Sequence, residues 1–224
     1  AIALSLVGSE MCIRDRSGGE SIFYFGVISS DCIRYEIFDM NKNIPLDKEV
    51  SNFGNPINKI VVSRGSPLAK LMIVGEAPGA KEEELGQPFV GRSGKLLDQL
   101  LQDVGIDISL DVYFCNVVKC RPPKNRRPTK TEIQENLPWL YQQIKLINPE
   151  IILLVGATAL EAILKNKSPI SILRGKWINW DGRLVMPIFH PAYLLRNQSK
   201  EKGTPMSLTK SDFLKIKEKI DTLK

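Results

Sequence analysis

In LMIVGEAPGA, residues 71–80, four apolar residues lead directly into Gly75 and Glu76. A short apolar run that ends at a glycine is typical of a buried strand that meets a functional turn. We therefore predict a first strand over residues 71–74. Three more apolar runs predict strands over residues 112–118, 151–155 and 184–189.

Helical patterns alternate with these strands. Residues 93–104 place their leucines on one helical face, and Gly105 is suited to end that helix. Thr129 and Glu132 form a capping box, which predicts a helix that runs toward Ile147. A further helix is expected over residues 158–164, and Phe213, Ile216, Ile220 and Leu223 form the apolar stripe of a last helix. This alternation predicts the α/β class, with a mainly parallel central sheet and helices on both faces.

Size and charge limit the function only broadly. The chain has 224 residues, enough for one good core, and a formal net charge of +6. Such a charge suits nucleic acid or a membrane surface, although a basic protein with no such partner fits equally well. No apolar run approaches the roughly 20 residues of a membrane span. Four cysteines without disulfide-like spacing favour a reducing compartment, and we expect a cytoplasmic monomer.

The first quarter of the chain reads differently from the rest. SLVGSEMCIRDR, residues 5–16, looks like a translated sequencing adapter, so residues 1–16 are interpreted as a non-native segment. Residues 17–58 form a poorly defined extension that Asn, Gly and Pro interrupt. One domain is expected over residues 59–224.

Polar side chains follow the predicted strands. Glu76 follows the first, Asn116 lies at the end of the second, and His190 follows the fourth. Ligands bind beyond the carboxyl ends of strands in such sheets, so these three side chains are candidates for one site. The alternative is structural, because a lone histidine beside an apolar strand is more often a hydrogen-bonded residue of the scaffold. His190 is the only histidine of the chain.

Two further segments carry features suited to phosphate. GQPFVGRSG, residues 86–94, opens onto a predicted helix, and the backbone amides of a helix N-terminus favour anions near Arg92 and Ser93. KCRPPKNRRP, residues 119–128, is a proline-stiffened loop with five basic residues. The loop predicts charge presented to phosphates, with a merely solvated loop as the alternative.

Four motifs together resemble one family. GEAPGA, GQPFVGRSGKLLDQLL, NVVKCRPPKNRRPT and HPAYLLR, in this order, are similar to the family-4 uracil-DNA glycosylases of the uracil-DNA glycosylase superfamily, from about Ile60 onward. The resemblance implies a three-layer αβα sandwich with a central parallel four-stranded sheet. It also implies an enzyme that flips uracil out of single- or double-stranded DNA and hydrolyses its N-glycosidic bond. A catalytically inactive nucleic-acid-binding member of the superfamily is the alternative.

The resemblance carries roles onto matching residues. Phe89 stacks on the flipped uracil, Asn116 pairs with its Watson–Crick edge, and Glu82 crowds C5, with Ala77 in the same substrate pocket. His190 donates to O2 of the departing uracil, and Glu76 orients or activates water. Leu194 or Leu195 wedges into the gap that the base leaves. The expected DNA-binding side chains are Arg92, Ser93, Arg121, Arg126, Arg127 and Arg196.

The sequence departs from this family at its iron–sulfur cluster. Members usually hold four irons on four cysteines, but only Cys120 stands at a ligand position here. The other three positions fall near Lys48, Ser51 and Asn136, while Cys115 is poorly aimed and Cys32 lacks a C-x-x-C partner. We therefore expect no cluster, no other cofactor and no metal.

Overall fold

A computed structural model describes the backbone of residues 3–7, 10–14, 23–29 and 32–38, and residues 60–223 with their side chains. The chain divides into two compact units, residues 1–57 and 58–224. In the first unit, four antiparallel strands pair in the order β1-β2-β3-β4. Their bounds are β1 Ala3–Val7, β2 Glu10–Arg14, β3 Phe23–Ser29 and β4 Cys32–Phe38.

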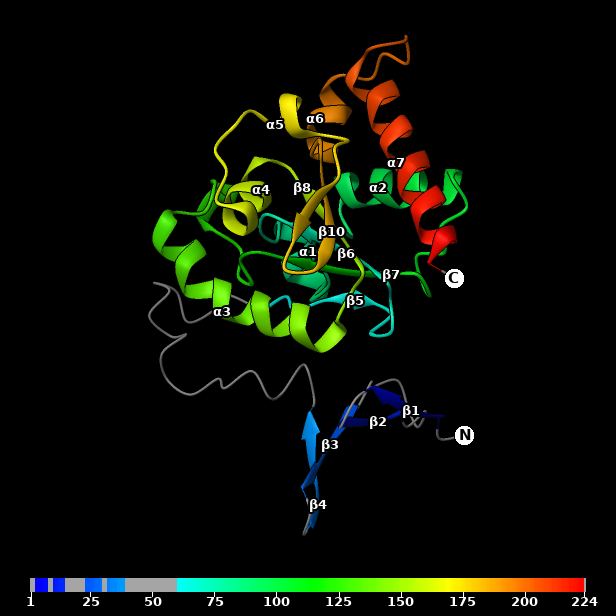
Figure 1. The fold of residues 1–224 in the computed structure, drawn as a ribbon. Helices are drawn as coiled ribbons and strands as arrows, with labels where there is room; N and C mark the ends of the chain where they lie inside the picture. Colours follow the sequence, from blue (N-terminus) through cyan, green and yellow to red (C-terminus); the bar gives the residue numbers. More distant parts are fainter. Residues whose placement is uncertain (1–2, 8–9, 15–22, 30–31, 39–59, 224) are drawn as a thin grey trace. The chain divides into compact units, whose positions relative to one another are not determined.

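The second unit is built on a mixed sheet of six strands in the order β5-β7-β6-β8-β10-β9 (Figure 1). The central strands β7, β6, β8 and β10 are parallel, and the edge strands β5 and β9 are antiparallel to their neighbours. The strands are β5 Arg64–Gly65, β6 Leu71–Gly75, β7 Val112–Asn116, β8 Ile151–Val155, β9 Ile178–Trp180 and β10 Arg183–Ile188.

The expectation of a four-stranded parallel sheet is correct for the centre and wrong for the edges. Both added strands are only two or three residues long and none of their residues is fully buried. Such short segments carry neither an apolar run nor a clear alternation, which are the patterns that predict strands. The sheet is therefore mixed and wider than the sequence indicated.

Helices flank both faces of this sheet. Side chains alternate between the faces of a strand, so Leu71 and Ile73 share one core cluster with Leu97 of α2 and Phe213 of α7. On the opposite face, the Tyr113 hydroxyl of β7 accepts a hydrogen bond from Gln143 of α3. The helices are α1 Ala80–Leu85, α2 Arg92–Asp103, α3 Lys130–Ile147, α4 Ala157–Leu164, α5 Ile170–Leu173, α6 Pro191–Arg196 and α7 Pro205–Thr222, with a short 3₁₀ helix at Pro123–Asn125.

The predicted helix boundaries are confirmed where side chains define them. The Thr129 hydroxyl accepts a hydrogen bond from the Glu132 amide at 3.2 Å, and the Glu132 carboxylate accepts one from the Thr129 amide at 2.7 Å. Gly105 follows α2 with a φ of 77°, in the left-handed region that glycine adopts readily. Within residues 60–223, the structure contains no helix both long and apolar enough to cross a membrane.

The capping box gives a first testable prediction. Thr129→Ala removes the hydroxyl that satisfies a free amide of α3, so we expect the free energy of unfolding to fall by about 1 kcal/mol. Urea denaturation followed by tryptophan fluorescence measures this change. Thr131→Ala, at an exposed position in the same helix, is the matched control. Equal stability of the two variants would contradict a capping role for Thr129.

Candidate active site

A cavity of about 980 Å³ lies at the carboxyl ends of the central strands. Glu76 directly follows β6, and Asn116 is the last residue of β7. His190 is the second residue after β10. These three side chains and Phe89 all line the cavity. The structure therefore brings together the four residues that the sequence places at the centre of the site.

The close pairing of β6 with β7 sets the distance between these groups. Gly75 lies opposite Asn116 in the parallel register, and the Val117 amide donates to the Gly75 carbonyl at 2.9 Å. A Cβ atom on Gly75 would lie 2.4 Å from Oδ1 of Asn116 and 2.5 Å from Cζ of Phe89. A side chain at Gly75 would displace the amide or the ring, so the glycine that ends β6 lets both pack against the backbone.

A buried lysine binds the backbone of Asn116. Asn116 is itself only 3% exposed, and its carbonyl accepts a hydrogen bond from Nζ of Lys119 at 2.6 Å. Lys119 also donates to Gln143, and burial lowers its pKa, against the opposing effect of Cys115. The sequence counted Lys119 among the basic residues presented to phosphates. That interpretation is wrong, because Lys119 is 4% exposed and its ammonium group binds Asn116 and Gln143.

Phe89 occupies a backbone conformation that few non-glycine residues adopt. Its φ is 56°, in the left-handed region, which costs of the order of 1 kcal/mol. Nη2 of Arg64 donates to the Phe89 carbonyl at 3.2 Å and pairs with Asp98, while its guanidinium lies 3.8 Å over the ring of Phe114. A Cβ on Gly94 would lie 1.8 Å from the Phe89 carbonyl oxygen. Arg64 and Gly94 thus fix the backbone of Phe89, whose side chain lines the cavity. Sequence reasoning missed the contribution of Arg64.

His190 is fixed as a neutral hydrogen-bond donor. Its Nδ1 accepts from the Ala192 amide at 3.1 Å, so a neutral ring carries its proton on Nε2. Burial lowers the pKa of His190, the charge of Glu76 opposes that effect, and Arg196 adds to it. At neutral pH the imidazole therefore offers an N–H group without a positive charge.

The Glu76 carboxylate has a partner that sequence reasoning missed. The Thr158 hydroxyl contacts Oε2 of Glu76 and accepts a hydrogen bond from Nε of Arg127 at 3.0 Å. Thr158 is 2% exposed and lies in the first turn of α4. The sequence pointed to Thr158 only through its place, three residues after the end of the third predicted strand. That strand itself ends without a polar residue.

Glu82 joins the two glycine-rich turns. Its carboxylate accepts hydrogen bonds from the Gly79 amide at 3.1 Å and from the Gly91 amide at 2.8 Å. A Cβ atom on Gly79 or Gly91 would lie within 3.0 Å of that carboxylate. Glu82 lines the cavity, as does Ala77, but both of its carboxylate oxygens bind backbone.

The predicted DNA-binding residues separate into two groups. Arg92, Ser93, Arg126 and Arg196 line the cavity, whereas Arg121 and Arg127 do not. The assignment of Leu194 as a wedge is contradicted, because Leu194 is fully buried in the core cluster. Consecutive helix residues point in different directions, so Leu195, the alternative, is the leucine that lines the cavity.

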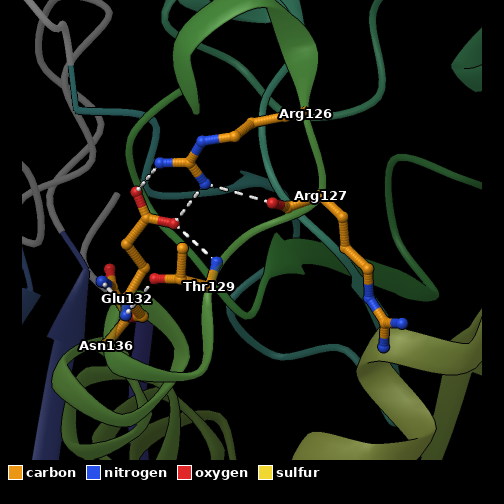
Figure 2. A network of polar contacts seen from close by, with 5 residues as sticks. All are labelled: Arg126, Arg127, Thr129, Glu132 and Asn136. Carbon is orange, nitrogen blue, oxygen red and sulfur yellow. Dashed lines mark hydrogen bonds and ion pairs between the residues drawn. The ribbon is translucent and has the colours of Figure 1, made fainter.

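The arginines of the basic loop are paired within the protein. Figure 2 shows Arg126 bound through two nitrogens to Glu132, the residue that also completes the capping box of α3. Arg126 thereby lowers the pKa of Glu132 to about 2, with the Thr129 hydrogen bonds adding to the effect and partial burial opposing it. The other pairs are Arg121 with Glu83 at 3.0 Å and Arg127 with Glu161 at 3.1 Å. A phosphate would have to compete with these carboxylates, which come from three different helices.

The family comparison agrees with the fold and the site. The model of the uracil DNA glycosylase superfamily matches residues 62–215, which is most of the second unit. The chain therefore belongs to the uracil DNA glycosylase superfamily.

Three relatives narrow the assignment to the type-4 family. The type-4 uracil-DNA glycosylase of Thermotoga maritima is 50% identical over 55% of this chain and 65% of its own. Those of Sulfurisphaera tokodaii and Archaeoglobus fulgidus are 40% and 39% identical over 62% of this chain, and cover 65% and 71% of their own lengths. The chain thus spans just under two thirds of the first two relatives, and the resemblance read from the four motifs is confirmed.

The described residues near Cys120 do not fit the four-cysteine cluster of the family. Asn136, at one expected ligand position, accepts a hydrogen bond from the Lys119 amide at 2.9 Å and donates to the Glu132 carbonyl at 2.8 Å. Burial and the charge of Glu83 raise the pKa of the Cys120 thiol. Cys115 is fully buried in β7, and the side chains of residues 1–59 lie outside the described part of the chain.

We predict that the purified full chain contains no iron and is colourless, because Asn136 ties α3 to the end of β7 where a thiolate would otherwise stand. Elemental analysis and visible absorbance measure this, with Cys120→Ser as a control expected to leave both unchanged. Asn136→Ala leaves a buried amide without a partner, so it should cost about 1–3 kcal/mol of stability. Stoichiometric iron that Cys120→Ser removes would overturn the prediction.

Proposed function

We propose that this chain excises uracil from DNA by hydrolysing the bond between base and sugar. The observation that carries the proposal is the convergence of Glu76, Phe89, Asn116 and His190 in one cavity. An aromatic ring, an amide, a neutral imidazole and a carboxylate are the groups needed to hold a flipped base and cleave its glycosidic bond. The names of the type-4 relatives support the same reaction.

Base selection rests on the side chain of Asn116. An amide presents one donor and one acceptor, which match O4 and N3–H of uracil. Cytosine reverses both positions, so buried groups would stay unpaired, and such mismatches can cost factors of about 10⁴ in specificity. The anchoring of the Asn116 carbonyl by Lys119 supports this role, because the amide is held on a rigid backbone. Phe89, fixed by its own backbone, supplies the ring on which uracil stacks.

Cleavage needs a donor for the departing base and an anion near the sugar. Negative charge develops on O2 of the leaving uracil, and a preorganised N–H group of His190 stabilises it without a proton transfer. Glu76 orients the attacking water and favours the positive charge that develops on the sugar. The lowered pKa of His190 supports the assignment of a neutral donor, because the ring with its proton on Nε2 is favoured over the imidazolium at neutral pH.

The activity is tested by incubating the full chain with a uracil-containing oligonucleotide in EDTA and measuring free uracil by chromatography. Glu76→Gln and His190→Ala should each lower the rate constant by about 10²-fold or more, because each removes a group that acts on the transition state. The control is Glu150→Gln, because Glu150 is exposed and directly precedes β8. DNA binding without any uracil release would instead favour the inactive member of the superfamily.

Asn116→Asp should admit cytosine. The carboxylate accepts from the exocyclic amino group of cytosine and, when protonated, donates to its ring nitrogen. The measurement is release of free cytosine from the unmodified oligonucleotide. A folded variant that releases uracil as before, and no cytosine, would remove Asn116 from base reading.

The charge that meets DNA is expected at the exposed arginines of the cavity rim. Arg92 and Arg196 line the cavity and are exposed, and each phosphate contact contributes about 0.9 to the slope of log affinity against log salt. Arg92→Gln and Arg196→Gln should each flatten that slope by about this amount. Fluorescence anisotropy over a salt series measures it, with Lys70→Gln, at the start of β6, as the control. Unchanged slopes in both rim variants would move the DNA-binding surface elsewhere.

A further inference from the structure

Thr158 joins the candidate catalytic carboxylate to the basic loop. Its hydroxyl contacts Glu76 on one side and Arg127 on the other, and the side chain is almost fully buried. Building on the proposed function, we propose that Arg127 and Thr158 form a positioning relay that holds the Glu76 carboxylate for attack by water. Neither residue touches the substrate in this proposal.

The direction of each hydrogen bond follows from the chemistry of the groups. A guanidinium has only donors, so Nε of Arg127 must donate to the Thr158 hydroxyl oxygen. A hydroxyl carries one hydrogen, and the contact with Arg127 uses only its oxygen. The hydrogen is therefore directed to Oε2 of Glu76, which accepts it as a carboxylate.

This arrangement distinguishes the two oxygens of Glu76. Oε2 is occupied by the Thr158 hydroxyl. Among residues 60–223, no hydrogen bond from the protein reaches Oε1, so this oxygen is left for the water. A carboxylate that is held at one oxygen and free at the other presents the water in one orientation, and orientation is a large part of what positioned groups contribute to rate.

Thr158 does not behave as an ordinary helical threonine. A threonine within a helix commonly turns its hydroxyl back to the carbonyl four residues earlier. In the first turn of α4 the hydroxyl is instead used between two charged side chains. The turn itself is close to the site, since a Cβ on Gly156, the N-cap residue of α4, would lie 3.2 Å from Cβ of His190.

Arg127 is directed toward α4 by two contacts. Its Nε binds Thr158, and its Nη2 binds Glu161 at 3.1 Å, three residues later on the same face of the helix. Figure 2 shows its side chain extending away from the Arg126–Glu132 pair, toward that helix. To reach a phosphate, Arg127 would have to give up both contacts, so its role differs from that of the rim arginines.

Kinetics of Thr158→Val and Thr158→Ser test the relay in the full chain. Valine keeps the shape and removes the hydroxyl, so kcat for uracil release should fall about 10- to 100-fold while KM and DNA affinity stay within about twofold. Serine keeps the hydroxyl and should restore most of the rate. Thr131→Val, in an exposed turn of α3, is the matched control. A valine variant with normal kcat, or with a loss only in KM, would overturn the relay.

Arg127→Gln separates positioning from phosphate binding. The relay predicts a fall in kcat with an unchanged salt slope of DNA binding, whereas a phosphate contact would flatten the slope by about 0.9 and spare kcat. In the Glu76→Gln background, Thr158→Val should cause no further loss, because the relay acts only through that carboxylate. An additional loss of similar size in that background would contradict the proposal.

A crystal structure of each Thr158 variant gives a readout that does not depend on activity. The Glu76 carboxylate should leave its position in Thr158→Val and keep it in Thr158→Ser. An unmoved carboxylate in the valine variant overturns the relay even if the wild type releases uracil. Absence of uracil release by the wild type would overturn the proposed function alone, because the position of Glu76 in the two variants still decides the relay.

Discussion

The packing of the Asn116 amide and the Phe89 ring against Gly75 is the constraint on which the site depends. A Cβ atom on Gly75 would overlap both the Asn116 amide and the Phe89 ring, so the position of these two groups depends on the glycine. The parallel pairing then continues past the strand ends, where the Val118 amide donates to the Glu76 carbonyl at 3.0 Å. Asn116 and Glu76 are thereby placed on two adjacent, rigidly paired segments. Such preorganisation matters because a small misplacement of reacting groups is costly in rate.

The sequence predicted those parts of the fold that rest on local patterns. The four central strands are mostly apolar because helices cover both sides of them, and their boundaries were correct to within about two residues. The capping box at Thr129 and the glycine after α2 are likewise local signals. The site residues at the strand ends followed from the topology of an α/β sheet. Their catalytic roles came from the resemblance to the family, and the geometry alone does not assign them.

The features that the sequence did not predict depend on partners far away in the chain. Thr158 meets Glu76 across 82 positions, and Arg64 reaches the Phe89 carbonyl across 25. In the sequence Lys119 is indistinguishable from its basic neighbours, whereas in the fold its ammonium group binds the Asn116 carbonyl. Charge patterns also misled at the loop, because each arginine there finds a glutamate on a different helix. A count of basic residues therefore overestimated the positive charge that the loop presents to solvent.

The short edges of the six-stranded sheet have a consequence for how the protein behaves at high concentration. An unpaired edge offers a row of free N–H and C=O groups on which another chain can add a strand. Here β5 spans two residues and β9 three, so neither edge is long enough to support extended pairing with a neighbour. These strands are too short to be predicted from the sequence pattern, and the same short length disfavours edge-to-edge aggregation of this unit.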